Sequence, residues 1–124
     1  MRGILAAAAV VLLGSAPALA ADDVMAGFYG NTLIVTGDAF QAHVHYSANH
    51  TFDISGTASG QAFSTKGSWK IDAKGQLCRS YEKAVPTVPN PFCSEATARK
   101  VGDTWTATTP DGSSRNITLV AGIK

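Results

Sequence analysis

The stretch QAFSTKGSWKI, residues 61–71, decides the fold class of this sequence. In an extended chain every second side chain points the same way. One side of this stretch carries Phe63, Thr65, Gly67, Trp69 and Ile71. The other side is mostly polar, and this alternation is typical of an antiparallel sheet with one buried face and one wet face. The stretch therefore predicts a long β-strand whose apolar side faces a core.

Short runs of β-forming residues continue on both sides of this stretch, and turn residues interrupt them about every ten positions. Residues 21–124 contain no sustained apolar stripe of helical period. We predict strands at Thr32–Thr36, Ala42–Tyr46, Thr51–Ser55, Gln61–Ile71, Gln76–Tyr81, Ala96–Val101, Thr104–Thr109 and Arg115–Ala121. The predicted fold is all-β, a single antiparallel meander of seven to eight strands. It forms either a small barrel-like (lipocalin-like) structure or a sandwich.

Two segments outside these strands lack the alternation. Glu82–Pro91 carries three prolines, and we expect it to be the only long irregular connection. Asp22–Gly30 precedes the first strand and either forms a short helical turn or stays extended.

The beginning of the chain has the pattern of a secretory signal peptide. Arg2 precedes the apolar run Ile4–Leu13, and Ala18-Leu19-Ala20 forms a small-residue cleavage site. We predict a signal peptide at 1–20 and a single β domain at 21–124. Arg2 is the only charged residue of the leader, so the remainder carries equal numbers of basic and acidic residues. We therefore expect a periplasmic or secreted protein with no nucleic-acid partner and no membrane span.

The domain contains two cysteines, Cys78 and Cys93. An even count in an exported chain indicates a disulfide. The alternative, a thiol pair for redox or metal chemistry, usually has the closer C-x-x-C spacing. We predict a structural disulfide between Cys78 and Cys93.

The hairpin around Ser47–His50 has two possible registers, and they differ in what faces the core. A two-residue loop would mix polar and apolar side chains on both faces. A turn with a bulge at His50 pairs Tyr46 with Phe52 and Val44 with Ile54, which collects the apolar residues on one face. We predict the bulged register, with His50 in the left-handed conformation.

This register places His43, His45 and Asp53 together on the opposite face. Two imidazoles and a carboxylate can hold a divalent ion such as zinc or copper, so these residues are the candidate metal ligands. The alternative is a solvated outer face whose polar residues bind nothing.

No catalytic set is evident in the sequence. Ser47 lies near His45, but no strained G-x-S-x-G turn accompanies it, and the aspartates fall mostly in or beside turns. We predict no catalytic residues, no cofactor and no enzymatic activity. Trp69 and Trp105 lie in alternating strands, where we expect core anchors rather than stacking platforms for a ligand.

The order of the motifs resembles that of a small exported proteobacterial β-domain family of unknown function. The resemblance rests on Tyr46 five residues before Thr51-Phe52, on Gly67-Ser68-Trp69, on the cysteine pair, and on Asp111-Gly112. It covers most of residues 30–122. The chain departs from the family pattern where Asn49-His50 replaces the Asp-Gly of the first turn. The resemblance implies the all-β fold and a periplasmic location, and it transfers no catalytic residue.

These observations predict a small non-enzymatic β domain that binds an unknown small ligand or an envelope protein. A filled interior would favour a scaffold with function on its loops, and a hollow interior would favour a carrier of small molecules. The alternatives are a metal-binding protein that uses His43, His45 and Asp53, and a protease-inhibitor-like protein that uses the Glu82–Pro91 loop.

Overall fold

The computed structural model describes residues 24–85 and 88–124, so the predicted signal peptide lies outside the described residues. The described chain forms one short 3-10 helix and eight strands. Their bounds are η2 (Ala26–Phe28), β1 (Thr32–Gly37), β2 (Phe40–Tyr46), β3 (Thr51–Ala58), β4 (Gln61–Ile71), β5 (Gln76–Tyr81), β6 (Phe92–Glu95), β7 (Thr104–Thr108) and β8 (Ser114–Val120). The predicted all-β class is confirmed.

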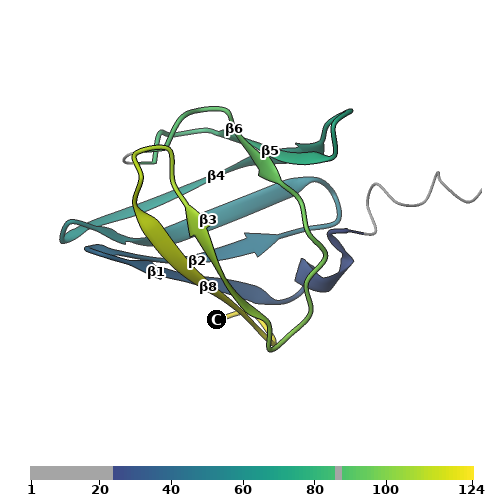
Figure 1. Cartoon of the computed structure of the whole chain (residues 1–124), viewed down its shortest axis with the longest axis horizontal. Coiled ribbons are helices and arrows are strands. Elements are labelled where there is room, and N and C mark those ends of the chain that lie inside the picture. The colour runs from purple at the N-terminus through teal and green to yellow at the C-terminus, as the bar shows by residue number, and fades with distance from the viewer. Residues whose placement is uncertain (1–23, 86–87) are drawn as a thin grey trace, which may run out of the picture.

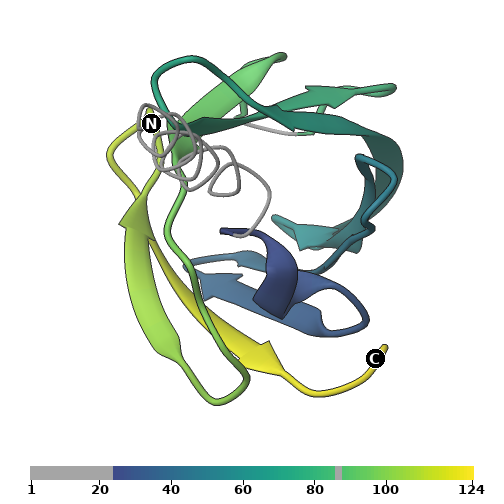
Figure 2. The ribbon, with the colours of Figure 1, turned by 90° about the vertical axis from the view of Figure 1, so that its right-hand side faces the viewer.

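The strands form one curled antiparallel sheet in the order β6-β5-β4-β3-β2-β1-β8-β7 (Figure 1). Consecutive strands pair throughout except β6 with β7, and β8 returns to pair with β1. This is the strand order of an eight-stranded meander barrel that is open between β6 and β7. Figure 2 shows the strands arranged around a central space. The curled single sheet decides for the barrel-like form and against the sandwich.

The β2–β3 hairpin has the predicted bulged register. Tyr46 pairs with Phe52 and Val44 pairs with Ile54. His50 has a φ of 70°, and its amide donates to the Ser47 carbonyl at 3.1 Å. The extra residue in the turn therefore puts the apolar side chains of both strands on the concave face.

The prediction of a strand at Ala96–Val101 is wrong. The strand that pairs with β5 is β6, in which Cys93 lies opposite Cys78. After Glu95 the chain leaves the sheet. Residues 96–103 form a second long irregular segment, in addition to the predicted Glu82–Pro91 loop. This segment packs against η2, because a Cβ built on Gly27 would lie 1.9 Å from the Arg99 carbonyl oxygen. Contact with η2, rather than strand pairing, thus holds the backbone at Arg99.

The core lies on the concave face of the sheet. In β2 every second residue is buried there, namely Ala42, Val44 and Tyr46, and Phe52 and Ile54 of β3 face them. At one end η2 contributes Phe28 and the preceding Met25, both buried. Figure 2 shows η2 across the end that faces the viewer. The short helical turn that the sequence allowed therefore covers one end of the barrel.

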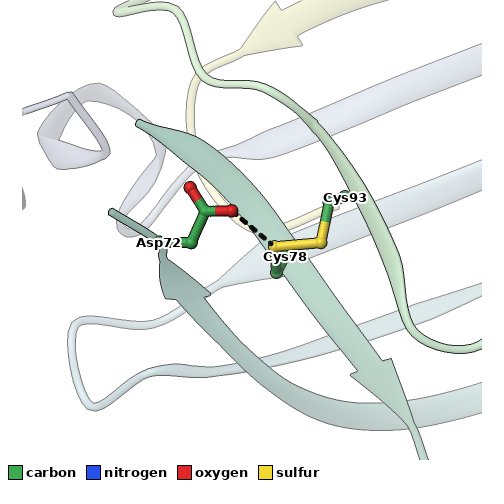
Figure 3. Close-up of side chains that lie close together, drawn as sticks. All are labelled: Asp72, Cys78 and Cys93. Carbon is green, nitrogen blue, oxygen red and sulfur yellow. Dashed lines mark hydrogen bonds between the residues drawn. A yellow bond between two sulfur atoms is a disulfide. The ribbon is translucent and has the colours of Figure 1, made fainter. Parts of the chain in front are cut away.

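Cys78 and Cys93 form the predicted disulfide, which joins directly opposed residues of β5 and β6 (Figure 3). The bond ties the edge strand β6 to the rest of the sheet. Within the described ranges, no helix is long and apolar enough to cross a membrane.

Candidate ligand cavity on the concave face

A cavity of about 550 Å³ lies inside the curl of the sheet. Its volume falls within the range of small-molecule sites, roughly 300–1,000 Å³. Most of the lining is apolar and includes Leu33, Val35, Val44, Ile54, Leu77 and Ile117. The exposed members of the lining include Glu95 of β6, Thr97 and Ala107 of β7. The cavity therefore opens where β6 and β7 leave the sheet unclosed.

Aromatic side chains fill the end of the barrel next to η2. Tyr46, Phe52 and Trp69 are 4 %, 3 % and 2 % exposed. The Tyr46 ring packs against Phe28 at 5.7 Å, Phe52 at 6.0 Å and Trp69 at 6.5 Å between centroids. Trp69 donates its indole N–H to the Ser47 carbonyl at 3.1 Å. The prediction that Trp69 is a core anchor is therefore confirmed.

Trp105 lies in a different environment from Trp69. It is only partly buried, lines the cavity, and carries the guanidinium of Arg99 4.1 Å from its ring centroid. The interior is thus filled at the Trp69 end and hollow beside Trp105.

Arg79 of β5 extends into the cavity between aromatic rings. Its Nε donates to the Tyr46 hydroxyl at 2.6 Å, and its Nη1 donates to the Ser94 hydroxyl at 3.3 Å. The guanidinium carbon lies 5.9 Å from the Tyr46 ring centroid and 5.6 Å from that of Phe92. Hydrogen bonds to one residue of β2 and one residue of β6 therefore fix the orientation of the Arg79 guanidinium.

Burial acts to lower the pKa of Arg79, but the phenol groups of Tyr46 and Tyr81 outweigh it and raise the pKa above its ordinary value. Burial raises the pKa of the Tyr81 phenol to about 12, against the opposing influence of the Arg79 charge. At neutral pH the Arg79 guanidinium is therefore charged and the Tyr81 phenol is neutral. Within residues 24–85 and 88–124, no carboxylate lies within ion-pair distance of Arg79, because His45–Asp53 is the only ion pair there.

Arg115 of β8 is a second arginine on the concave face and is 8 % exposed. Its guanidinium lies 4.4 Å from the Phe40 ring centroid, and Nη1 contacts the Ser114 carbonyl at 3.4 Å. A Cβ on the facing Gly37 would lie 2.9 Å from this side chain. Gly37 therefore leaves the space in which Arg115 lies flat against the sheet.

The predicted metal ligands lie on the convex face, away from the cavity. His45 Nδ1 is 2.8 Å from Asp53 Oδ1, whereas His43 Nδ1 is 3.4 Å from the Lys124 carbonyl oxygen. The structure therefore brings His45 and Asp53 together but directs a ring nitrogen of His43 elsewhere. Among the described residues these three do not form a group with all donor atoms within 4.8 Å. The metal site stays a prediction.

Asp72, Cys78 and Cys93 do form such a group (Figure 3). Asp72 Oδ2 lies 3.7 Å from the Cys78 sulfur, which carries no proton because it belongs to the disulfide. The other oxygen, Oδ1, accepts hydrogen bonds from the amides of Lys74 and Gln76. The carboxylate therefore shapes the β4–β5 turn, and the bonded sulfurs are not available as thiolate ligands.

The Glu82–Pro91 loop is tied to the edge of the sheet at one end. The Asn90 side chain accepts from the Tyr81 amide and donates to the Tyr81 carbonyl, both at 2.9 Å. Its role as an inhibitory loop stays a prediction.

No family model, curated protein or solved structure matches this chain. The resemblance to an exported proteobacterial family therefore stays an expectation.

The sequence analysis missed Arg79, Tyr81 and Arg115 as cavity residues, although the sequence contains a signal for each. Arg79 and Tyr81 follow Leu77 at intervals of two, and Arg115 precedes Ile117 at the same interval. In an alternating strand this interval places each of them on the apolar side. A charged or hydroxyl-bearing side chain on the apolar side of a strand is the signal that could have identified them.

Proposed function

We propose that this protein is a small β domain that binds a largely apolar small molecule inside its curled sheet. The observation that carries the proposal is the cavity of about 550 Å³, with a mostly apolar lining and a few polar groups. Binding sites for small molecules usually have this composition, because apolar area supplies affinity and a few polar groups set orientation.

The open edge of the sheet supports the proposal because it provides a route into the cavity. A closed eight-stranded barrel has an interior just wide enough to be filled by side chains or to hold one small ligand. Here β6 and β7 do not pair, and exposed residues of both strands line the cavity. A ligand can therefore enter between these strands without displacing the aromatic cluster at the η2 end.

The proposal places this binding role in the periplasm or outside the cell. Two observations support that location: the signal-peptide pattern of residues 1–20 and the disulfide between Cys78 and Cys93. Disulfides persist in oxidising compartments, where reductants do not keep thiols free.

Fluorescence titration with N-phenyl-1-naphthylamine, a neutral apolar dye, tests the proposal. Ala107 lines the cavity at its exposed edge, so Ala107→Trp puts an indole into the space with little strain. Ala62→Trp is the matched control, because Ala62 is exposed and lies on the opposite side of β4 from Phe63 and Trp69. We expect saturable binding by the wild type and by Ala62→Trp, and loss of binding in Ala107→Trp.

Absence of saturable dye binding by the folded wild type would contradict the proposal. Equal binding by Ala107→Trp and the wild type would also contradict it, because the dye would then lie outside the cavity.

A further inference from the structure

We propose that the ligand of this cavity carries an anionic head group of the carboxylate class, and that Arg79 binds it. This inference rests on the proposed function, because it names the class of ligand for the same cavity.

Arg79 has hydrogen-bond donors that no described residue accepts. A guanidinium has five N–H donors in a planar fork. The described part of the chain accepts two of them, through Tyr46 and Ser94. The remaining donors belong to Nη1 and Nη2, the end of the fork that binds carboxylates with two parallel hydrogen bonds.

The positive charge of Arg79 has no ion-pair partner among the described residues. Removing an ion from water is costly unless an opposite charge or a set of hydrogen bonds compensates. Among the described residues, Glu95 is the only acidic one that lines the cavity, and it is exposed on the same side of β6 as Cys93. It forms no ion pair with Arg79. A ligand carboxylate would supply the charge that the described residues do not provide.

Two phenol groups, those of Tyr46 and Tyr81, lie near the Arg79 guanidinium. The Tyr46 hydroxyl oxygen accepts a hydrogen bond from Arg79 Nε, so the hydroxyl hydrogen of Tyr46 remains available to a ligand. Tyr81 lies on the same side of β5 two residues further on, and it also lines the cavity. The Arg79 guanidinium with its neighbouring phenol donors matches the head group of a monoanion. The apolar remainder of the cavity then takes the hydrocarbon part of the same molecule.

Two other arginines, Arg99 and Arg115, also line the cavity. The guanidinium of Arg99 lies on the partly exposed Trp105 ring, whereas Arg79 donates to hydroxyl groups of two strands. Arg115 is the closer competitor because it is buried. Its guanidinium lies on the Phe40 ring, and Nη1 is directed to the Ser114 carbonyl. The carboxylate of Asp111 in the adjoining turn also interacts with its charge. A carboxylate of the protein therefore acts on the charge of Arg115, whereas the described groups that act on Arg79 are hydroxyls and aromatic rings.

A comparison of decanoate with decanol tests the inference, because the two probes share a chain length and differ in head-group charge. Each is titrated as a competitor of N-phenyl-1-naphthylamine. Hydrogen bonds that involve a charged group contribute roughly 1.5–3 kcal/mol, so we expect decanoate to bind the wild type about tenfold more tightly or better. Arg79→Gln should bind both probes about equally while keeping its affinity for decanol. Lys70→Gln removes one exposed positive charge from the outer face of β4 and should retain the preference.

A second measurement needs no variant and applies if Arg79→Gln does not fold. The carboxyl carbon of [1-¹³C]decanoate reports the ionisation of the bound head group by NMR. Pairing with a guanidinium favours the ionised form, so the carboxyl pKa of bound decanoate should be lower than that of free decanoate.

The outcomes separate this inference from the proposed function. If decanoate and decanol bind the wild type equally, or if the bound carboxyl pKa is unchanged, the inference is overturned and the binding role stands. If the preference disappears in Arg99→Gln or in Arg115→Gln and persists in Arg79→Gln, the assignment to Arg79 is overturned. If the wild type binds neither probe nor the dye, the proposed function fails and the inference with it.

Discussion

The hydroxyl of Tyr46 and the guanidinium of Arg79 meet at 2.6 Å, although their strands β2 and β5 are separated in the sheet by β3 and β4. A contact between strands so far apart requires the sheet to curl, and the hydrogen bond holds the two sides of that curl together. It also orients a cavity arginine that has no acidic partner within the described residues. One contact therefore links the shape of the sheet to the chemistry of the cavity.

Tyr46→Phe should destabilise the protein more than Tyr81→Phe at neutral pH. The Tyr46 hydroxyl accepts a charge-assisted hydrogen bond, worth roughly 1.5–3 kcal/mol. The Tyr81 hydroxyl makes no hydrogen bond within residues 24–85 and 88–124, so its removal should cost less. Urea unfolding of both variants checks this order. Equal losses would show that the Tyr46–Arg79 bond adds nothing to stability.

Stability should fall in alkaline solution because of Tyr81. Its pKa is raised to about 12 in the folded protein, whereas an unfolded tyrosine titrates near 10. The contribution is therefore complete below about pH 10 and is lost as the pH rises toward 12, since the unfolded state releases its proton first. A two-unit shift corresponds to about 2–3 kcal/mol at most.

Unfolding free energies of the wild type and Tyr81→Phe, measured at intervals from pH 8 to pH 12, isolate this contribution from that of the lysines. The difference between the two proteins should be constant up to about pH 10 and should change above it. A constant difference over the whole range would mean that Tyr81 titrates normally in the folded state.

Gly67→Ala should be among the most damaging single substitutions in the sheet. A Cβ at this position would lie 1.8 Å from the Ser80 carbonyl oxygen and 3.1 Å from the Phe52 ring. Overpacking of this kind costs about 1–3 kcal/mol or more. Gly60→Ala is the comparison, since a Cβ there meets no atom within 4 Å and only the backbone angle, φ 80°, opposes it. Thermal unfolding that ranks Gly60→Ala as the worse variant would contradict the packing described for β4.

Removal of the disulfide by Cys78→Ser with Cys93→Ser should lower the melting temperature by several degrees or more. The bond closes a loop with a sequence separation of 15, for which loop entropy predicts about 3 kcal/mol. Calorimetry of the double variant beside the wild type measures the change. An unchanged melting temperature would show that packing alone holds β6 against β5.

Local patterns predicted most of the fold. The two-residue period of Gln61–Ile71 and the bulged turn at His50 depend on neighbours in the chain, and both agree with the structure. Ala96–Val101 was wrong because β-forming composition alone does not show which strand a segment can pair with. In the structure, β6 is the segment that contains Cys93 opposite Cys78, and the chain then leaves the sheet.

The cavity could not be predicted to the same extent. Alternation places Arg79 on the apolar side of β5, but it does not show how strongly the sheet curls. The proximity of Arg79 to Tyr46 depends on that curl, which accumulates over several strands. The residues of the concave face could therefore be predicted from the sequence, whereas the existence and size of the cavity between them could not.

The most direct test of the binding role is a map of where a small apolar molecule contacts the protein. Amide and indole NMR spectra of ¹⁵N-labelled protein, recorded during titration with N-phenyl-1-naphthylamine, provide that map. Shifts should concentrate on cavity residues such as Val44, Leu77 and Ile117 and on the Trp105 indole, and His43 and Lys70 on the convex face should stay unchanged. Shifts confined to the convex face, or no saturable shifts at all, would contradict the proposal that the curled sheet holds a ligand.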